Sequence, residues 1–226
     1  MEKSLLFAQK LSSIKSQLNT SHLLIVSKTR SEEDIIEYYK LGQRDFGENR
    51  VQELLEKAEN LREICPEIRW HMIGHLQSNK VNQLFTVPNL WAIHSVDDEE
   101  LLQKIIKSEH RLNHEVKIFL QFNTSKEEAK SGFEDYEKLL NAAKSIPVNS
   151  KIKLQGLMTM GTLRTENFEQ EAKRCFSELN QLKNKLEIDL GLKLQTSMGM
   201  SQDYQIAVEE HSDWIRIGTF MFSHGS

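Results

Sequence analysis

The sequence has few cysteines and no long hydrophobic segment. Among its 226 residues only Cys65 and Cys175 are cysteines, and they lie far apart without a histidine pattern nearby. Two such cysteines predict reduced structural thiols rather than a disulfide framework or a metal site. No apolar run approaches the ~18 residues that a membrane-spanning helix needs. These absences favour a cytoplasmic protein without a membrane partner.

Basic clusters and the common catalytic motifs are also absent. The net charge is −4 and no run of lysine or arginine occurs, so we expect no nucleic-acid partner. The chain contains no GxGxxG or Walker-type glycine loop, no HExxH pair and no GxSxG elbow. We therefore expect no bound metal, and the chemistries that these motifs mark fit the chain poorly.

Eight short apolar runs alternate with helical patterns along the chain. The runs occupy residues 23–27, 45–47, 68–74, 90–95, 115–122, 152–158, 193–197 and 214–218. Strict strand–helix alternation predicts a parallel sheet, and eight units predict closure into a barrel. We expect one α/β domain over residues 1–226, a single (β/α)8 TIM-type barrel with an extra N-terminal helix. An open doubly wound sheet is the alternative.

The two ends of the chain are predicted to complement each other. Residues 1–18 have spaced apolar positions interrupted by Gln, Lys and Ser, which indicates an amphipathic helix rather than a signal peptide. Residues 219–226 are too few for a full eighth helix after the last strand. We therefore expect the N-terminal helix to cover the gap beside that strand.

Polar and glycine-rich motifs follow the predicted strands. They are Lys28, GEN (47–49), IGH (73–75), MTMG (158–161), SMGMS (197–201) and RIGT (216–219). Functional residues of such a barrel lie at the C-terminal strand ends, and phosphate commonly binds the loops after strands seven and eight. Glycines allow close backbone approach to an anion, and Ser201 is placed to cap the short helix that follows. These two loops predict a phosphate site, with plain tight turns as the alternative.

Lys28 and Arg216 predict the other contacts at the same mouth. Lys28 ends the first strand, where a lysine is either a surface residue or an amine that forms a Schiff base. Arg216 alternates with two isoleucines, so it points into the barrel if these pack outward. A buried guanidinium needs an acceptor, either a pyridine nitrogen or a carboxylate such as Asp45 or Glu48. Pyridoxal phosphate would engage Lys28 through its aldehyde and the last two loops through its phosphate.

Several further strand-end residues have two interpretations. Asn49 followed by Gln52 looks like a capping box that opens a helix. His75 is a hydrogen-bonded structural group or a site residue, while His71 and His94 carry less signal. Four methionines in two strand-end loops either fill gaps in the core or wall a planar ring: Met158, Met160, Met198 and Met200.

Taken together, these motifs resemble the pyridoxal phosphate homeostasis protein family. The resemblance runs along essentially the whole chain and rests on KTR (28–30), FGENRVQE (46–53), WHMIGHLQSNKV (70–81), GLMTMG (156–161), SMGMS and RIGT. This chain has Arg30-Ser31 where the family commonly has a proline, and Phe222-Ser223 where FG is usual. The family is similar to the barrel domain of alanine racemase, which implies the same single barrel here.

The resemblance implies a cofactor and the residues that hold it. Pyridoxal 5'-phosphate would form a Schiff base with Lys28, and Arg216 would face its pyridine nitrogen. The phosphate would lie on Ser201, Gly218 and Thr219. The remaining residues implied to line the site are Ser197, Met198, Asn49 and His75.

The resemblance also implies a carrier rather than a vigorous enzyme. Alanine racemase-like enzymes use a second acid/base from an additional C-terminal domain and a partner subunit, whereas few residues follow the last strand here. All four tyrosines fall in predicted helices. We expect a monomer that buffers, carries or delivers pyridoxal phosphate, with pyridoxal phosphate-dependent apoenzymes as transient partners. A racemase or decarboxylase of weak activity is the alternative, and a phosphosugar isomerase-type barrel without cofactor is a third.

Overall fold

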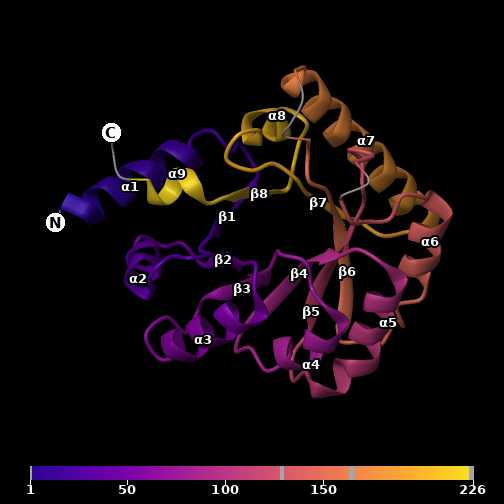
Figure 1. Ribbon diagram of the computed structural model, residues 1–226, viewed down its shortest axis with the longest axis horizontal. Coiled ribbons are helices and arrows are strands. Elements are labelled where there is room, and N and C mark those ends of the chain that lie inside the picture. Colours follow the sequence, from indigo (N-terminus) through magenta and orange to yellow (C-terminus); the bar gives the residue numbers. More distant parts are fainter. Residues whose placement is uncertain (1, 128–129, 163–165, 224–226) are drawn as a thin grey trace.

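Eight parallel strands form a closed barrel in sequence order in the computed structural model, which describes residues 2–127, 130–162 and 166–223 (Figure 1). The strands are β1 (His22–Val26), β2 (Asp45–Glu48), β3 (Arg69–Met72), β4 (Leu90–Val96), β5 (Val116–Gln121), β6 (Ile152–Met158), β7 (Gln195–Ser197) and β8 (Trp214–Ile217). Strand β1 pairs with both of its neighbours, since Ile25 lies opposite Phe46 of β2 and Ile217 of β8. The predicted barrel is confirmed, and the open sheet is wrong.

Helices surround the barrel, and all but the first and the last of those described connect successive strands (Figure 1). They are α1 (Glu2–Lys15), α2 (Glu32–Lys40), α3 (Val51–Leu61), α4 (Val81–Leu84), α5 (Glu99–Ser108), α6 (Tyr136–Lys144), α7 (Phe168–Leu190), α8 (Tyr204–Glu209) and α9 (Thr219–Phe222), with 3-10 turns at Ser78–Lys80 and Glu109–Arg111. The sequence predicts a start near Thr165 for the longest helix, and that residue lies outside the described ranges. The strand and helix order otherwise follows the sequence pattern closely.

Side chains of the strands separate into an inner and an outer layer. Leu23, Ile25, Ile215 and Ile217 belong to the large buried cluster between the strands and the helices. A smaller cluster fills the barrel: Leu24, Ala92, Phe119, Met158 and Trp214. Because Arg216 alternates with two outward isoleucines and lies opposite Leu24, it points into the barrel, as its spacing predicts.

Helix α1 covers the barrel beside β8, where the last helix is only one turn long. Phe7 stacks on Tyr38 of α2 with ring centroids 4.4 Å apart, and Phe222 of α9 meets Phe7 edge-on at 6.0 Å. The Tyr38 hydroxyl donates to the Met221 carbonyl at 2.6 Å. Helices α1 and α9 therefore lie side by side and close the outer ring, as the sequence predicts (Figure 1).

Two further observations bear on the class of protein. Within residues 2–127, 130–162 and 166–223, no helix combines the length and apolar character needed to cross a membrane. The same residues hold no group of three or more His, Cys, Asp or Glu side chains placed to bind a metal ion. Cys65 and Cys175 are both buried free thiols.

Replacing Phe7 tests the role of α1 in closing the ring. Phe7 is 2% exposed, so Phe7→Ala should lower the free energy of unfolding by about 3–5 kcal/mol, the usual cost of a buried Phe→Ala change. Leu5 lies on the same helix but is 62% exposed, so Leu5→Ala should change it by less than about 0.5 kcal/mol. Urea unfolding measures both, and equally small effects would show that α1 contributes little to the barrel.

Candidate functional site

A cavity of about 370 Å³ opens at the C-terminal strand ends. Its size falls in the range of about 300–1,000 Å³ that is usual for small-molecule sites. Its lining residues are Val26, Lys28, Thr29, Arg30, Asn49, Ile73, Met158, Met160, Met200, Ser201, Gln202, Arg216, Gly218 and Thr219. The structure thus brings together six of the residues that the sequence assigns to one site: Lys28, Asn49, Ser201, Arg216, Gly218 and Thr219.

Lys28 stands at the edge of the cavity on a constrained turn. Its side chain is exposed, whereas the preceding Ser27 is fully buried. Thr29 has a φ of 61°, a left-handed conformation that is unfavourable for a β-branched residue. The Thr29 N–H donates to Glu53 Oε1 at 2.6 Å, and the Arg30 N–H donates to the Ser27 carbonyl at 3.0 Å. Hydrogen bonds within the protein therefore hold the backbone on both sides of Lys28.

Lys57 joins a buried ionic network behind this turn. Its Nζ lies 2.9 Å from Oε1 of Glu48 and 2.9 Å from Oε1 of Glu53, and it donates to the Ser27 carbonyl at 2.8 Å. The Ser27 hydroxyl donates to the same oxygen of Glu48 at 2.7 Å. Burial raises the pKa of Glu48, and the charge of Lys57 opposes that rise. The network links the backbone beside Lys28 to helix α3.

Arg216 lies at the inner end of the cavity and is 5% exposed. Its Nη1 donates to Ser197 Oγ at 2.7 Å, and its Nη2 donates to the Thr159 carbonyl at 3.0 Å. Burial lowers the pKa of Arg216 to about 10, and the Asp203 carboxylate opposes the shift. The guanidinium is thus cationic at neutral pH, and Ser197 and the Thr159 carbonyl hold it in place.

The alternative in which Arg216 pairs with Asp45 or Glu48 is wrong. Asp45 instead accepts a hydrogen bond from Arg69 and is hydrogen-bonded to His71. Glu48 forms an ion pair with Lys57. Both carboxylates are therefore engaged elsewhere.

The loops after β7 and β8 form the opposite wall of the cavity. A Cβ on Gly218 would lie 3.2 Å from both the Cβ and the carbonyl oxygen of Val26, so this glycine allows a close approach to β1. Helix α8 begins at Tyr204 with Asp203 as its N-cap, and the Asp203 carboxylate accepts from the Met200 N–H at 2.5 Å. The predicted capping role of Ser201 is therefore wrong, and Ser201 lies on the cavity wall instead.

Asn49 also lies on the cavity rather than at a helix cap. Helix α3 starts at Val51, and its N-cap is Arg50, which makes no side-chain capping bond. The capping box predicted from Asn49 and Gln52 is therefore wrong. A Cβ on Gly74 would lie 2.3 Å from the Asn49 carbonyl oxygen, so the loop after β3 packs directly on the Asn49 backbone.

Three residues that the sequence assigns to the site do not line the cavity. Ser197 is fully buried beneath it and accepts from Arg216. Met198 is fully buried in the outer hydrophobic cluster, on the helix side of the strands. The His75 side chain is 64% exposed, and its Nδ1 lies 3.0 Å from Oδ2 of Asp97. Ser197 thus contacts a cavity residue, whereas Met198 and His75 have other surroundings.

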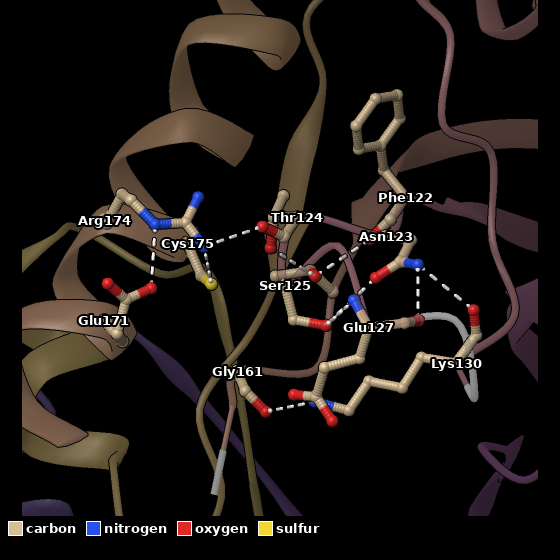
Figure 2. Close-up of polar contacts among 11 residues, drawn as sticks. Phe122, Asn123, Thr124, Ser125, Glu127, Lys130, Gly161, Glu171, Arg174 and Cys175 are labelled. Carbon is tan, nitrogen blue, oxygen red and sulfur yellow. Dashed lines mark hydrogen bonds and ion pairs between the residues drawn. The ribbon is translucent and has the colours of Figure 1, made fainter. Parts of the chain in front are cut away.

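A polar cluster braces the loops that follow β5 and β6 (Figure 2). Lys130 Nζ lies 2.6 Å from Glu127 Oε1 and donates to the Gly161 carbonyl at 3.2 Å. Asn123 Nδ2 donates to the carbonyls of Glu127 and Lys130, each at 3.1 Å. Arg174 of α7 donates to a backbone carbonyl of the same loop at 3.1 Å. These contacts hold the loop after β5 and join it to Gly161, the residue after the cavity residue Met160.

Two sets of buried polar residues around the cavity are not among those predicted from the sequence. Lys57 has no predicted role, although it follows Glu53 by one helical turn, the spacing of an ion pair. His71 and His94, which are fully buried, also have no predicted role in the site. The available signal was their position, because a polar side chain at an inward-facing strand position must find a partner inside the barrel.

Comparison with known proteins decides the family. The chain matches the family model for the alanine racemase N-terminal domain over residues 6–225. The pyridoxal phosphate homeostasis protein of Homo sapiens is 41% identical over 207 residues, which cover 88% of this chain and 75% of the human protein. This chain belongs to the pyridoxal phosphate homeostasis protein family. A family member from Aquifex aeolicus is 36% identical, over 90% of this chain and 87% of that protein.

Solved structures agree with this family assignment. PipY of Synechococcus elongatus, solved with pyridoxal phosphate bound, has a TM-score of 0.84 and 32% identity, covering 96% of this chain and 100% of PipY. The PipY structure without the cofactor has a TM-score of 0.88. Alanine racemase of Clostridium difficile has a TM-score of 0.74 at 13% identity, over 97% of this chain and 56% of the racemase, and so shares the fold. The resemblance to this family that the sequence motifs indicate is therefore confirmed.

Removing Lys57 tests the ionic network behind Lys28. Lys57→Met leaves the buried Glu48 carboxylate without its cation, which should cost about 3–5 kcal/mol of unfolding free energy. The loss should shrink as the pH falls, because the raised pKa of Glu48 lets it take up a proton and bury no charge. Urea unfolding at several pH values measures this.

The matched control is the double variant Glu48→Gln/Lys57→Met. It removes both charges together and should recover most of the lost stability. A double variant as unstable as Lys57→Met alone would contradict the pairing.

Proposed function

We propose that this protein holds pyridoxal 5'-phosphate at the barrel mouth as a Schiff base on Lys28. Its role would be intracellular pyridoxal phosphate homeostasis, in which it buffers, carries or delivers the cofactor. The names of its relatives and the cofactor-bound structure of PipY support the proposal. The observation that carries it is one cavity that holds an exposed primary amine and a buried guanidinium together.

The lining residues suit each part of this cofactor. Pyridoxal phosphate supplies an aldehyde that condenses reversibly with an amine, an aromatic ring with one nitrogen acceptor, and a phosphate group. Lys28 provides the amine, and Arg216 provides a donor for the ring nitrogen. Ser201 and Thr219 provide hydroxyls, and Gly218 provides close backbone approach, on the wall proposed for the phosphate. Apolar side chains suit the faces of the ring: Ile73, Met158, Met160 and Met200.

The same cavity supports a holding role rather than catalysis. None of its described lining residues is Asp, Glu, His, Tyr or Cys. Apart from the Lys28 amine, these residues therefore include no side chain of the kinds that commonly act as a general acid or base. A racemase needs a second acid/base on the other face of its substrate, so the lining disfavours that activity.

Arg216 also disfavours strong activation of the cofactor. With a pKa of about 10, it remains protonated at neutral pH and acts only as a donor. A ring nitrogen that accepts from a guanidinium stays unprotonated, and such a ring withdraws fewer electrons than a protonated one. Tight holding combined with weak activation is what a carrier needs.

We also propose a cytoplasmic monomer that passes the cofactor to apoenzymes in transient encounters. The exposure of Lys28 supports this part of the proposal, because an incoming amine can reach the linkage from solvent.

Borohydride trapping tests the anchor. The protein is mixed with pyridoxal phosphate, reduced with borohydride and analysed by peptide mass mapping. We expect one dominant label, on Lys28, since reduction turns a Schiff base into a stable secondary amine. Lys28→Ala and Lys28→Arg should both lose this label, because neither side chain forms the linkage. Before reduction, both variants should also lack the visible absorbance band of the Schiff base. Lys15→Ala, which changes an exposed lysine on α1, should keep both.

A label that persists in Lys28→Arg would contradict the assignment of the anchor. A protein that takes up no label at all, with no absorbance change on adding the cofactor, would contradict the proposed function.

Hydrogen exchange in deuterated water separates the carrier from the enzyme. A panel of amino acids is incubated with the loaded protein, and deuterium uptake at Cα is followed by NMR. Because the described lining residues include no second acid/base, uptake should not exceed that with free pyridoxal phosphate by more than about tenfold, well short of the 10²–10⁴-fold that a positioned acid or base contributes. Steady exchange that depends on Lys28 would favour a weak racemase or decarboxylase instead.

A further inference from the structure

Five side chains inside the barrel form an unbroken hydrogen-bonded chain that leads away from the cavity. The links are Arg216 Nη1 to Ser197 Oγ at 2.7 Å, Ser197 Oγ to His94 Nδ1 at 2.8 Å, His94 Nε2 to His71 Nδ1 at 3.0 Å, and His71 Nε2 to Asp45 Oδ1 at 3.1 Å. Each residue comes from a different strand, and all are buried. Asp45 is the first residue of β2, so the chain ends at the face opposite the cavity.

The carboxylate end fixes the protons of both imidazoles. Burial raises the pKa of Asp45, but the hydrogen bonds from His71 and Arg69 and the charge of Arg69 lower it again, so Asp45 is ionised and only accepts. His71 Nε2 must then carry a proton. Burial lowers the pKa of His71, so the ring is neutral and its Nδ1 is an acceptor. His94 Nε2 must therefore carry the proton that it donates to His71.

The guanidinium end is compatible with the same direction. Burial also lowers the pKa of His94, so this ring is neutral as well and its Nδ1 accepts. The Ser197 hydroxyl must therefore donate to His94. Arg216 can only donate, and it finds the lone pairs of Ser197 Oγ. The direction set at the carboxylate end thus also satisfies the guanidinium end, and in this arrangement every link has one donor and one acceptor.

We propose that Asp45, His71 and His94 are positioning residues for Arg216. Because the Ser197 proton is committed to His94, Ser197 presents only lone pairs to the guanidinium. Ser197 and the Thr159 carbonyl then fix the guanidinium plane, which leaves its other N–H groups for an acceptor bound in the cavity that Arg216 lines. A carboxylate at the far face of the barrel thereby controls a donor at the cavity. The proposal rests on the proposed function only for the identity of the bound acceptor.

The protein without cofactor provides the first test. Proton–nitrogen correlation spectra of uniformly ¹⁵N-labelled protein report which ring nitrogen of each histidine carries a proton, and single His→Gln variants assign the signals. We expect His71 and His94 both neutral and both protonated on Nε2. An Nδ1 proton, or a charged ring, on either histidine at neutral pH overturns the proposal whether or not the protein binds pyridoxal phosphate.

Variants at the far end of the chain provide the second test. Asp45→Leu removes the last acceptor, so His71 and His94 should lose their fixed Nε2 protonation. Pyridoxal phosphate should then bind roughly tenfold more weakly, the scale of one hydrogen bond to a charged group. Asp45→Asn keeps an acceptor oxygen and should restore the tautomers and most of the affinity. The matched control, Arg69→Met, removes the ion pair on Asp45 but leaves the chain intact, and should change neither readout.

A folded Asp45→Leu protein with unchanged tautomers and unchanged affinity overturns the proposal. If Asp45→Leu does not fold, His71→Phe serves instead, because it breaks the chain at its middle. A folded His71→Phe protein that keeps the wild-type affinity and the Nε2 proton of His94 overturns the proposal in the same way. If no variant and no wild-type protein binds the cofactor, the proposed function fails, and the nitrogen spectra alone still decide the arrangement of the chain.

Discussion

A cation buried inside a closed barrel is the constraint around which the interior of this protein is organised. A guanidinium cannot lose its charge at neutral pH and cannot be left without acceptors in an apolar interior. Arg216 obtains two acceptors, from Ser197 and from the Thr159 carbonyl, and neither is charged. The carboxylates of Asp203 and Asp45 make no direct hydrogen bond to it, and Asp45 lies at the opposite face of the barrel. This separation leaves the guanidinium satisfied but still able to donate to a ligand.

Two separate polar networks hold different parts of the cavity in place. The network around Lys57 is ionic and holds the backbone on either side of Lys28, including the strained Thr29. The chain through the histidines is neutral in its middle and ends at Arg216. Neither Lys57 nor the histidines line the cavity. The residues that set its geometry are thus different from those that would touch a ligand.

The sequence predicts the barrel and much of the cavity because both follow from local periodicity. Each strand is a short apolar run, and the order of strands in such a barrel is the order of the sequence, so strand ends converge without further information. Arg216 was placed correctly because alternation along one strand decides which way it points.

What the sequence could not predict depends on side-chain partners from distant segments. Asn49 and Ser201 precede helices and have the right chemistry for caps, but Arg50 and Asp203 occupy the cap positions. A shift of one or two residues at a helix start is decided by how the loop packs, and propensity does not resolve it. His71 and His94 were undervalued for a similar reason, since each is explained only by the other and by Ser197, and their spacing along the sequence shows none of this.

The pairing of β1 with β8, together with the contact of α1 with α9, also constrains how the chain acquires its structure. The second edge of β1 pairs with Trp214 to Ile217 of β8, so this edge stays open until β8 has emerged from the ribosome. Until then the apolar face of α1, including Phe7, has no partner from α9. Long-range closure of this kind slows folding and exposes apolar surface in intermediates. The molecule is therefore expected to be most vulnerable to aggregation during its own synthesis, before the last strand enters the barrel.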